Sequence, residues 1–417
     1  MSLNPNSVTG QALDRADARV RQDEGLGGAL RAFGDRVRSG DLGMIPVAVG
    51  LVLIAVVFTT LNPVFLRPGN VSNLLYDCAT TGIISLGIVC VLLLGEIDLS
   101  VGSMSGLASA ILGVLWINNG WPLVGAIAVA LGFGALVGAL YATLYNRVGM
   151  PSFVATLAGL LTLLGLQLYL LGTSGSINLP FNLAFVRFGQ NAYMPNWLSV
   201  LLALVPGAVV LWGGLKARAR RQAAGLTGTA LSVIVVKAVV LTVGLVAVVL
   251  YLAQGRGVPW MFGMFVAMVA AMDYAITRTK WGRSMMAVGG NREAARRAGI
   301  NVRRIYMSAF VLCSTLAALG GLLSAARLGS ASQQAGTGDV NLNAIAAAVI
   351  GGTSLFGGRG SAYSALLGII VIQAISNGLT LLNLSSSLRY MILGGVLALA
   401  VIVDSLARRS RASHGRG

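Results

Sequence analysis

The chain has 417 residues, of which 56% are hydrophobic and only 10% are charged, and it carries 55 glycines and a net charge of +17. Soluble domains usually carry about 25% charged residues, so this composition excludes a soluble enzyme and a disordered chain. It indicates a polytopic membrane protein, in which glycine allows helices to approach closely.

Apolar stretches long enough to cross a bilayer recur along the whole chain. A spanning helix needs about 20 mostly apolar residues. The sequence therefore predicts an all-α membrane bundle of about 12 spans, within a range of 10–14. In chain order the predicted spans are residues 44–61, 74–94, 99–117, 122–145, 152–172, 196–215, 233–252, 258–277, 305–325, 342–356, 362–382 and 388–405.

Basic residues set the predicted orientation, because Lys and Arg collect in cytoplasmic connections. If the N-terminus is inside, the two tails and the inner connections hold 24 of the 30 basic residues. The outer connections hold five, and Lys237 lies within a span. Both termini are therefore predicted to be cytoplasmic. No nucleic-acid-binding motif accompanies the positive charge, so nucleic acid is not expected as a partner.

The chain is expected to have three regions. Residues 1–43 form a cytoplasmic tail, residues 44–406 the transmembrane domain, and residues 407–417 a basic cytoplasmic tail. Within the first tail, Leu26, Leu30, Phe33 and Val37 recur at helical spacing. This tail is either an amphipathic helix lying on the inner membrane face or a loosely ordered segment.

Two glycine-rich segments interrupt their apolar surroundings. The first, GEIDLSVGS at 95–103, contains Gly95, Asp98, Ser100 and Gly102; the second, GGTSLFGGRGS at 351–361, contains Gly351, Gly352, Gly357 and Gly358. Such breaks in two halves of a transporter often mark discontinuous helices beside the transport path. The alternative is a pair of tight cytoplasmic turns, which the number of crossings favours.

The connection 278–304 is the most basic part of the chain, with eight basic residues and one acid. Asn291 is suited to cap a helix, and Glu293 favours the positive helix start. Ala294 and Ala295 are good helix formers, and Gly299 can end the helix in a left-handed conformation. The pattern predicts a short cytoplasmic helix near 291–298 that enters a groove on another protein. The alternative is a basic loop that only fixes topology.

The sequence contains no P-loop and no cluster of residues suited to catalysis or metal binding. A P-loop needs a lysine after a glycine-rich turn, and none of the three lysines follows a glycine. Any coupling to ATP must therefore come from a partner chain. His414 is the only histidine and the three cysteines lie in apolar stretches, so no metal site, cofactor or catalytic residue is predicted.

Three motifs in order resemble the membrane permease subunits of bacterial monosaccharide ABC importers. They are GEIDLSVGS at 95–103, GGNREAARRAGINV at 289–302 and AIAAAVIGGTSLFGGRGS at 344–361. The resemblance runs from about residue 45 to 405. The form of the first motif, the ARLGSASQQAGTG stretch at 326–338 and the length are more similar to the xylose type than to the ribose type.

The resemblance implies an assembly in the bacterial inner membrane. It implies two permease chains, two cytoplasmic ATP-binding subunits and a periplasmic sugar-binding protein, which together import a monosaccharide by alternating access. The segment Glu293-Ala294-Ala295-x-x-x-Gly299 matches the first half of the motif that such permeases present to their ATPases, and with the cap Asn291 it forms the predicted ATPase-coupling set; the second half, Ile-x-Leu-Pro, is missing at the expected distance.

A neutral sugar needs polar groups and rings rather than counter-charges. The candidates in or near spans are Asn73, Gln167, Tyr169, Gln373 and Asn377, for each of which the alternative is an interhelical hydrogen bond. Two other functions stay open on the residues alone. One is a sugar carrier or facilitator that works without ATP, and the other is a scaffolding membrane protein.

Overall fold

The computed structural model of the chain describes Gly28 and residues 45–413. These residues divide into two compact units, a larger one with Gly43–Tyr193 and Val258–Leu406 and a smaller one that includes Met194–Gly257. The main helices in chain order are α2 (Ile45–Leu61), α3 (Pro68–Leu92), α4 (Val101–Leu112), α5 (Leu123–Thr143), α6 (Ser152–Leu171), α7 (Ala184–Gln190), α8 (Asn196–Ala223), α9 (Leu231–Ala253), α10 (Trp260–Arg278), α11 (Lys280–Gly290), α12 (Arg292–Arg297), α13 (Val302–Leu328), α14 (Val340–Ile350), α15 (Tyr363–Leu381) and α16 (Ser386–Ser413).

Each of the twelve predicted spans contains one of these helices, and the all-α membrane bundle is confirmed. Within the described residues, nine helices are long and apolar enough to cross a membrane, while α14 and the apolar stretch Val47–Leu61 are shorter. The number of crossings and the side of the termini stay predictions. The amphipathic stretch expected at 26–37 lies outside the described residues, and α16 continues past 406 to Ser413.

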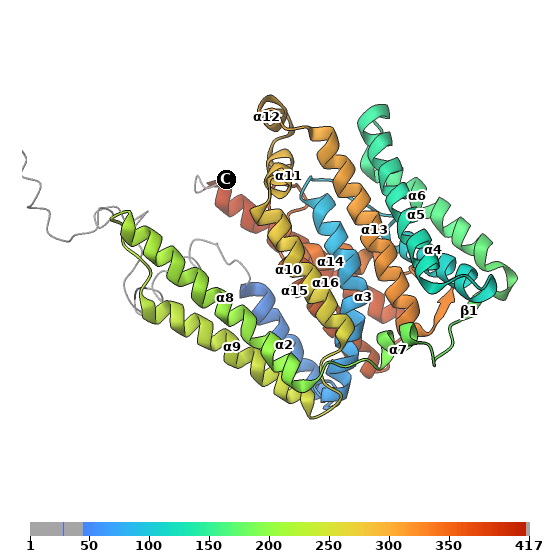
Figure 1. The fold of residues 1–417 in the computed structure, drawn as a ribbon, viewed down its shortest axis with the longest axis horizontal. Coiled ribbons are helices and arrows are strands. Elements are labelled where there is room, and N and C mark those ends of the chain that lie inside the picture. The colour runs from blue at the N-terminus through green and yellow to red at the C-terminus, as the bar shows by residue number, and fades with distance from the viewer. Residues whose placement is uncertain (1–27, 29–44, 414–417) are drawn as a thin grey trace, which may run out of the picture. The chain divides into compact units, whose positions relative to one another are not determined.

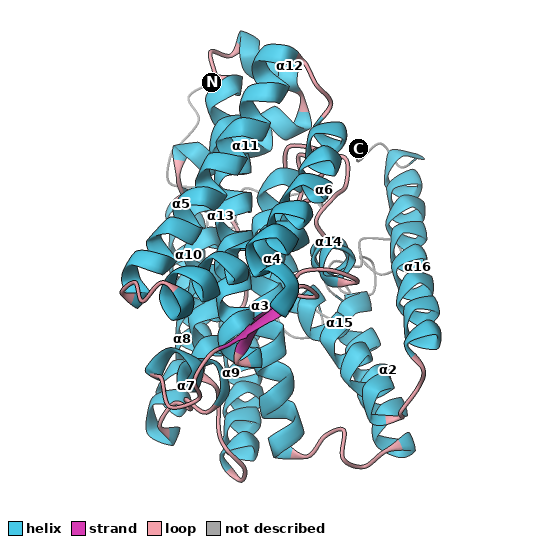
Figure 2. Ribbon diagram, turned by 90° about the vertical axis from the view of Figure 1, so that its right-hand side faces the viewer, coloured by secondary structure: helices cyan, strands magenta, loops and turns pink. Residues whose placement is uncertain are grey.

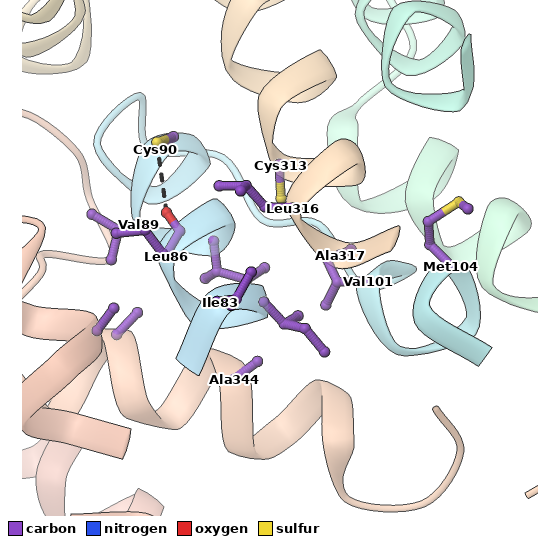
Figure 3. Packing of buried hydrophobic residues seen from close by; sticks show 14 of the residues in the cluster. Ile83, Leu86, Val89, Cys90, Val101, Met104, Cys313, Leu316, Ala317 and Ala344 are labelled. Atoms are coloured by element: carbon purple, nitrogen blue, oxygen red, sulfur yellow. Dashed lines mark hydrogen bonds between the residues drawn. The ribbon is translucent and has the colours of Figure 1, made fainter. Parts of the chain in front are cut away.

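The core of the larger unit is built around α3 and α13, which lie side by side in Figure 1. Small residues bring their backbones together. A Cβ on Gly87 of α3 would lie 2.9 Å from the Cys313 carbonyl oxygen, and one on Gly138 of α5 would meet the backbone of Phe310 and Val311. Close contacts of this kind are typical of membrane helices, where packing replaces the hydrophobic effect. Figure 3 shows buried side chains of α3 and α13 together with Val101 and Met104 of α4 and Ala344 of α14.

Several helix ends in the larger unit are irregular. A π-helix, Gly113–Asn118, extends α4, and another, Leu144–Val148, extends α5. After α6, a 3-10 turn at Gly172–Ser174 leads to β1 (Ser176–Asn178), which pairs antiparallel with β2 (Ser330–Ser332), the strand drawn in magenta in Figure 2. This pair ties the connection that follows α6 to the connection that follows α13.

The smaller unit contains a hairpin of α8 and α9. Its helices pack through Gly207, whose missing side chain makes room for Thr242, and Gly214, which faces Ile234. Basic residues extend α8 beyond the predicted end of its span at 215, since Arg220 and Arg221 occupy its last turn. The ammonium of Lys216 lies 4.7 Å from the centre of the Trp212 ring.

Candidate functional site

The basic connection 278–304 folds into two capped helices. The Thr279 hydroxyl accepts a hydrogen bond from the Gly282 N–H at the start of α11. The Asn291 side-chain oxygen accepts one from the Ala294 N–H at the start of α12, at 2.9 Å. The short helix predicted near 291–298 is therefore confirmed, with Asn291 as its cap and six residues in length.

The end of α12 is a glycine cap. Gly299 has a φ of +82°, its N–H donates to the Arg296 carbonyl, and the next N–H, of Ile300, donates to the Ala295 carbonyl. This is the Schellman pattern, which glycine adopts without a steric penalty. Ala295 is buried and seats α12 on the bundle, whereas Glu293, Ala294 and Gly299 are exposed.

The exposed face of α12 carries a small ion-pair cluster. Glu293 accepts from Arg296 at 2.9 Å and from Arg297 at 3.2 Å. These hydrogen bonds lower the pKa of the Glu293 carboxyl. The arginines lie in the last turn and the glutamate in the first turn, which is the arrangement that a helix dipole favours. The face is therefore charged but internally paired.

The two glycine-rich breaks meet at the end of α11. The Gly358 N–H donates to the Leu93 carbonyl at 2.9 Å, and the Gly95 backbone lies against Phe356 and Gly357. A Cβ on Gly289 would collide with the Leu93 carbonyl oxygen and would lie 2.7 Å from the Gly358 nitrogen. We call the contact of residues 93–95, 289–290 and 356–358 the glycine junction. It joins both breaks directly to the segment that leads into α12.

The predicted span 342–356 is wrong in its extent. Helix α14 has 11 residues, so it is about 16 Å long and cannot cross a hydrocarbon core of about 30 Å. It ends at Ile350, where Gly351 and then Gly352, with a φ of +104°, turn the chain away from the helix. This half-length helix fits the discontinuous-helix alternative, while the shared position of the two breaks fits the alternative of paired turns.

Within the first break, Asp98 is fully buried and shapes the entry into α4. One carboxyl oxygen accepts from the Ser100 N–H at 2.8 Å and from the Ser100 hydroxyl at 2.7 Å. Burial raises the pKa of Asp98, and the hydrogen bonds from Ser100 oppose that rise. The N–H of Leu99, between Asp98 and Ser100, donates to the hydroxyl of Thr156 in α6. The carboxylate thus holds a turn rather than facing solvent.

A non-helical segment, residues 329–339, lies inside the larger unit beside α4. Gly336 packs against Gly102, whose N–H donates to the Asn341 side-chain oxygen. Gln167 is fully buried, and its amide nitrogen donates to the carbonyls of Ser332 and Ala335, each at 2.9 Å. Non-helical backbone that is removed from water needs such hydrogen-bond partners. Gln167 therefore forms an intramolecular contact, the alternative given for it above.

Three other predicted polar residues gather along one side of α3. Arg327 of α13 pairs with Asp77 at 3.0 Å and also donates to the Asn73 side chain at 3.4 Å. Gln373 of α15 donates to the Asp77 backbone carbonyl. The Arg327 guanidinium lies 4.8 Å from the centre of the Tyr76 ring. This polar column joins α3, α13 and α15.

The column continues at Asn377, which exchanges hydrogen bonds with Asn70 at 2.8 and 3.2 Å. Four of the five predicted polar residues are therefore bonded to other parts of the chain. Tyr169 differs, since it is 81% exposed on the surface of α6 and far too open to line an interior path.

An open polar hollow of about 230 Å³ lies between α15, α16 and the start of α14. Its carboxylate and guanidinium are bonded within the chain, Asp339 to Asn343 and Arg389 to Thr380. Its lining residues are Asp339, Ser376, Ser386, Arg389, Tyr390 and Leu393. Among the described residues, no group of His, Cys, Asp and Glu is arranged to hold a metal ion.

Sequence reasoning missed most of the partners in these contacts. Asp77 and Asn73 lie four residues apart on one helix face, which is a signal for a polar column, but nothing in the sequence pairs them with Arg327. The sequence predicts Arg389 only as one of the five basic residues in the outer connections. Five of the six residues that line the hollow come from the consecutive helices α15 and α16, and the sixth, Asp339, immediately precedes α14.

Apolar helices long enough to span a membrane, the half-length helix α14 and the two glycine-rich breaks together define a multi-pass membrane protein of the transporter class. The chain belongs to the family described as branched-chain amino acid transport system / permease component, whose model matches residues 70–401. It is therefore a membrane transport component.

The chain is similar over nearly its whole length to curated sugar permeases. It is 36% identical to the xylose transport system permease protein XylH of Escherichia coli, over 89% of this chain and 94% of that protein. It is 34% identical to XylH of Haemophilus influenzae, over 89% and 98%. It is also 34% identical to the ribose import permease protein RbsC of Escherichia coli, over 85% and 91%. These matches confirm the family resemblance found in the motifs. No solved structure matched the chain.

Proposed function

We propose that this chain is the permease subunit of an ABC importer that moves a monosaccharide, with xylose favoured, from the periplasm to the cytoplasm. Similarity to xylose and ribose permeases over nearly the whole chain carries this proposal. The chain supplies the path, and a separate subunit supplies ATP hydrolysis, since no lysine follows a glycine-rich turn. It lies in the inner membrane with an even number of crossings, within the predicted range of 10–14, and both termini inside.

The assembly contains two copies of this chain, two cytoplasmic ATP-binding subunits and a periplasmic sugar-binding protein. The exposed face of α12 contacts the ATP-binding subunit through Glu293, Ala294 and Gly299, while Asn291 starts the helix and buried Ala295 seats it. Capping at both ends supports this role, because it gives a six-residue helix a fixed shape before any partner binds.

The sugar path follows the breaks and the hollow. Gly95, Asp98, Ser100 and Gly102 of the first break and Gly351, Gly352, Gly357 and Gly358 of the second are the candidates for its wall, and in the conformation described here the two breaks are in contact at the glycine junction. The polar column of Asn73, Gln373 and Asn377 closes the path in the conformation described here, because its side chains bond to the chain itself. The hollow holds sugar in transit without selecting it, since the periplasmic protein selects the sugar.

Reconstitution in liposomes tests the proposal. The chain is combined with a candidate ATP-binding subunit and a candidate sugar-binding protein, and ATP hydrolysis and uptake are measured with xylose, ribose and no sugar. Sugar-stimulated hydrolysis with uptake is expected. Uptake by the chain alone without ATP would instead favour a secondary carrier, and a lack of any flux would favour a scaffold.

A charge reversal on α12 tests the contact surface. Replacing Glu293 with Arg should abolish uptake while the protein stays folded in the membrane, because an exposed acid becomes a base beside Arg296 and Arg297. Glu293→Gln keeps the size of the side chain and separates the effect of charge from that of volume. A bulky basic residue at Gly299 should have the same effect as Glu293→Arg. Normal uptake by both basic variants would remove these residues from the contact.

A further inference from the structure

Glu96, in the first break, is held by two hydroxyl groups. The Tyr145 hydroxyl donates to one carboxylate oxygen at 2.6 Å, and the Ser152 hydroxyl donates to the other. Tyr145 comes from the π-helical end of α5, and Ser152 is the first residue of α6. The break between α3 and α4 is therefore bound to the ends of two further helices through a single carboxylate.

Arg292, the first residue of α12, reaches the same hydroxyl. Its guanidinium donates to the Tyr145 oxygen at 3.1 Å, so this hydroxyl accepts from Arg292 and donates to Glu96. The guanidinium also lies 5.4 Å from the ring centres of both Tyr145 and Tyr306, and these two rings stack with their centres 4.6 Å apart. A planar guanidinium over aromatic rings is a favourable arrangement.

This arginine differs from its neighbours on the same helix. Arg296 and Arg297 bond to Glu293 on the exposed face of α12. Arg292 is also exposed, but its guanidinium lies against the stacked rings of Tyr145, from the π-helical end of α5, and Tyr306 of α13. Helix α12 is therefore connected to the first break by two routes, through the backbone at Gly289 and through the side chain of Arg292.

We propose that Arg292, Tyr145 and Glu96 form a latch that transmits displacement of α12 to the break between α3 and α4. The proposal rests on the proposed function, in which the ATP-binding subunit moves α12. When α12 moves, Arg292 withdraws from the Tyr145 hydroxyl, and the bond from that hydroxyl to Glu96 weakens because the two bonds polarise each other. The three side chains act as positioning residues, and none of them touches the sugar or ATP.

The latch is tested in liposomes that contain the chain, its ATP-binding subunit and the sugar-loaded binding protein. The readout is the ratio of ATP hydrolysis with sugar to hydrolysis without sugar. A folding defect lowers both rates together and leaves this ratio unchanged. Tyr145→Phe removes the shared hydroxyl and keeps the stacked ring, and it should lower the ratio about tenfold, since a hydrogen bond to a charged group is worth at least that factor.

Three further variants serve as comparisons in this experiment. Tyr274→Phe is the matched control, because Tyr274 is 65% exposed and lies outside this network, and its ratio should stay at the wild-type value. Arg292→Gln combined with Tyr145→Phe should lower the ratio no further than Tyr145→Phe alone, because the two residues act in series. Arg292→Lys keeps the charge without the planar group and should give an intermediate ratio.

The outcomes separate the latch from the proposed function. If sugar stimulates hydrolysis in the wild type and Tyr145→Phe has the same ratio, the latch is overturned and the proposed function stands. Additive effects of the Arg292 and Tyr145 variants would also overturn the latch. If sugar does not stimulate the wild type with any candidate partner, the proposed function fails, and the latch fails with it.

Discussion

Two adjacent glycines at the end of α11 offer a sharp test of the glycine junction. Alanine at Gly290 meets no atom within 4 Å, so Gly290→Ala should bring only the helix-propensity gain, at most about 1 kcal/mol. Alanine at Gly289 has the same gain, but its methyl group collides with the Leu93 carbonyl oxygen and crowds the Gly358 nitrogen. Because these neighbours are backbone atoms, they cannot rotate away.

The cost at Gly289 follows from these contacts. Overpacking costs about 1–3 kcal/mol, and rigid backbone neighbours favour the upper end. Separating the segments also breaks the bond from Gly358 to Leu93, which is worth about 1 kcal/mol. After the propensity gain, Gly289→Ala should destabilise the protein by about 3 kcal/mol, and the two variants should differ by about 3–4 kcal/mol.

Unfolding of both variants in lipid nanodiscs, followed by tryptophan fluorescence during titration with a denaturing detergent, measures this difference. Uptake in liposomes, measured on the same preparations, should fall for Gly289→Ala and stay normal for Gly290→Ala. Equal stability of the two variants would refute the reasoning, because it would mean that residues 93 and 358 are not packed against Gly289 in the membrane.

Three further substitutions probe other contacts. Asn291→Ala removes the α12 cap and should lower the stability of that helix by about 1 kcal/mol. The ATP-binding subunit should then co-purify more weakly with the variant, and undiminished binding would show that the cap is dispensable. Gln167→Leu removes the side-chain donor to the Ala335 carbonyl and one of two donors to the Ser332 carbonyl, and it should destabilise the protein by about 1–2 kcal/mol in the same detergent titration, whereas a neutral result would contradict a role in holding residues 332–335. Asp77→Asn and Arg327→Gln should each destabilise the protein, and the double variant should lose less than the sum of the two, since it leaves no unpaired charge; strict additivity would exclude the pair.

The helices were predictable because membrane spans are set by composition within a local window. Each predicted span holds a helix, and Asn291 and Gly299 mark the ends of α12 as their side-chain and backbone chemistry requires. The exception is 342–356, where the helix ends at Ile350 and Gly351 and Gly352 turn the chain, although the predicted span extends to Phe356. Apolar composition alone does not show that the helix stops at half the length of a span.

The contacts between segments could not be predicted in this way. Leu93, Gly289 and Gly358 are far apart in sequence and carry no chemistry that marks them as neighbours, since they meet through backbone atoms. Gln167 was correctly identified as a polar residue in a span, but its two backbone acceptors lie about 165 residues away. Pairing of this kind depends on packing geometry, which a single sequence does not express as a pattern.

The burial of the native cysteines has a practical consequence for observing α12 in motion. Cys78, Cys90 and Cys313 are each 0% exposed, and Figure 3 shows Cys90 and Cys313 in the core. Thiol reagents need an accessible thiolate, so the unmodified chain should react slowly with them. A cysteine introduced at Ala294 or Ala298, both exposed on α12, would then be the fast-reacting thiol within the described residues. Spin labels or fluorophores could be placed there without first removing any native cysteine and disturbing the packing beneath.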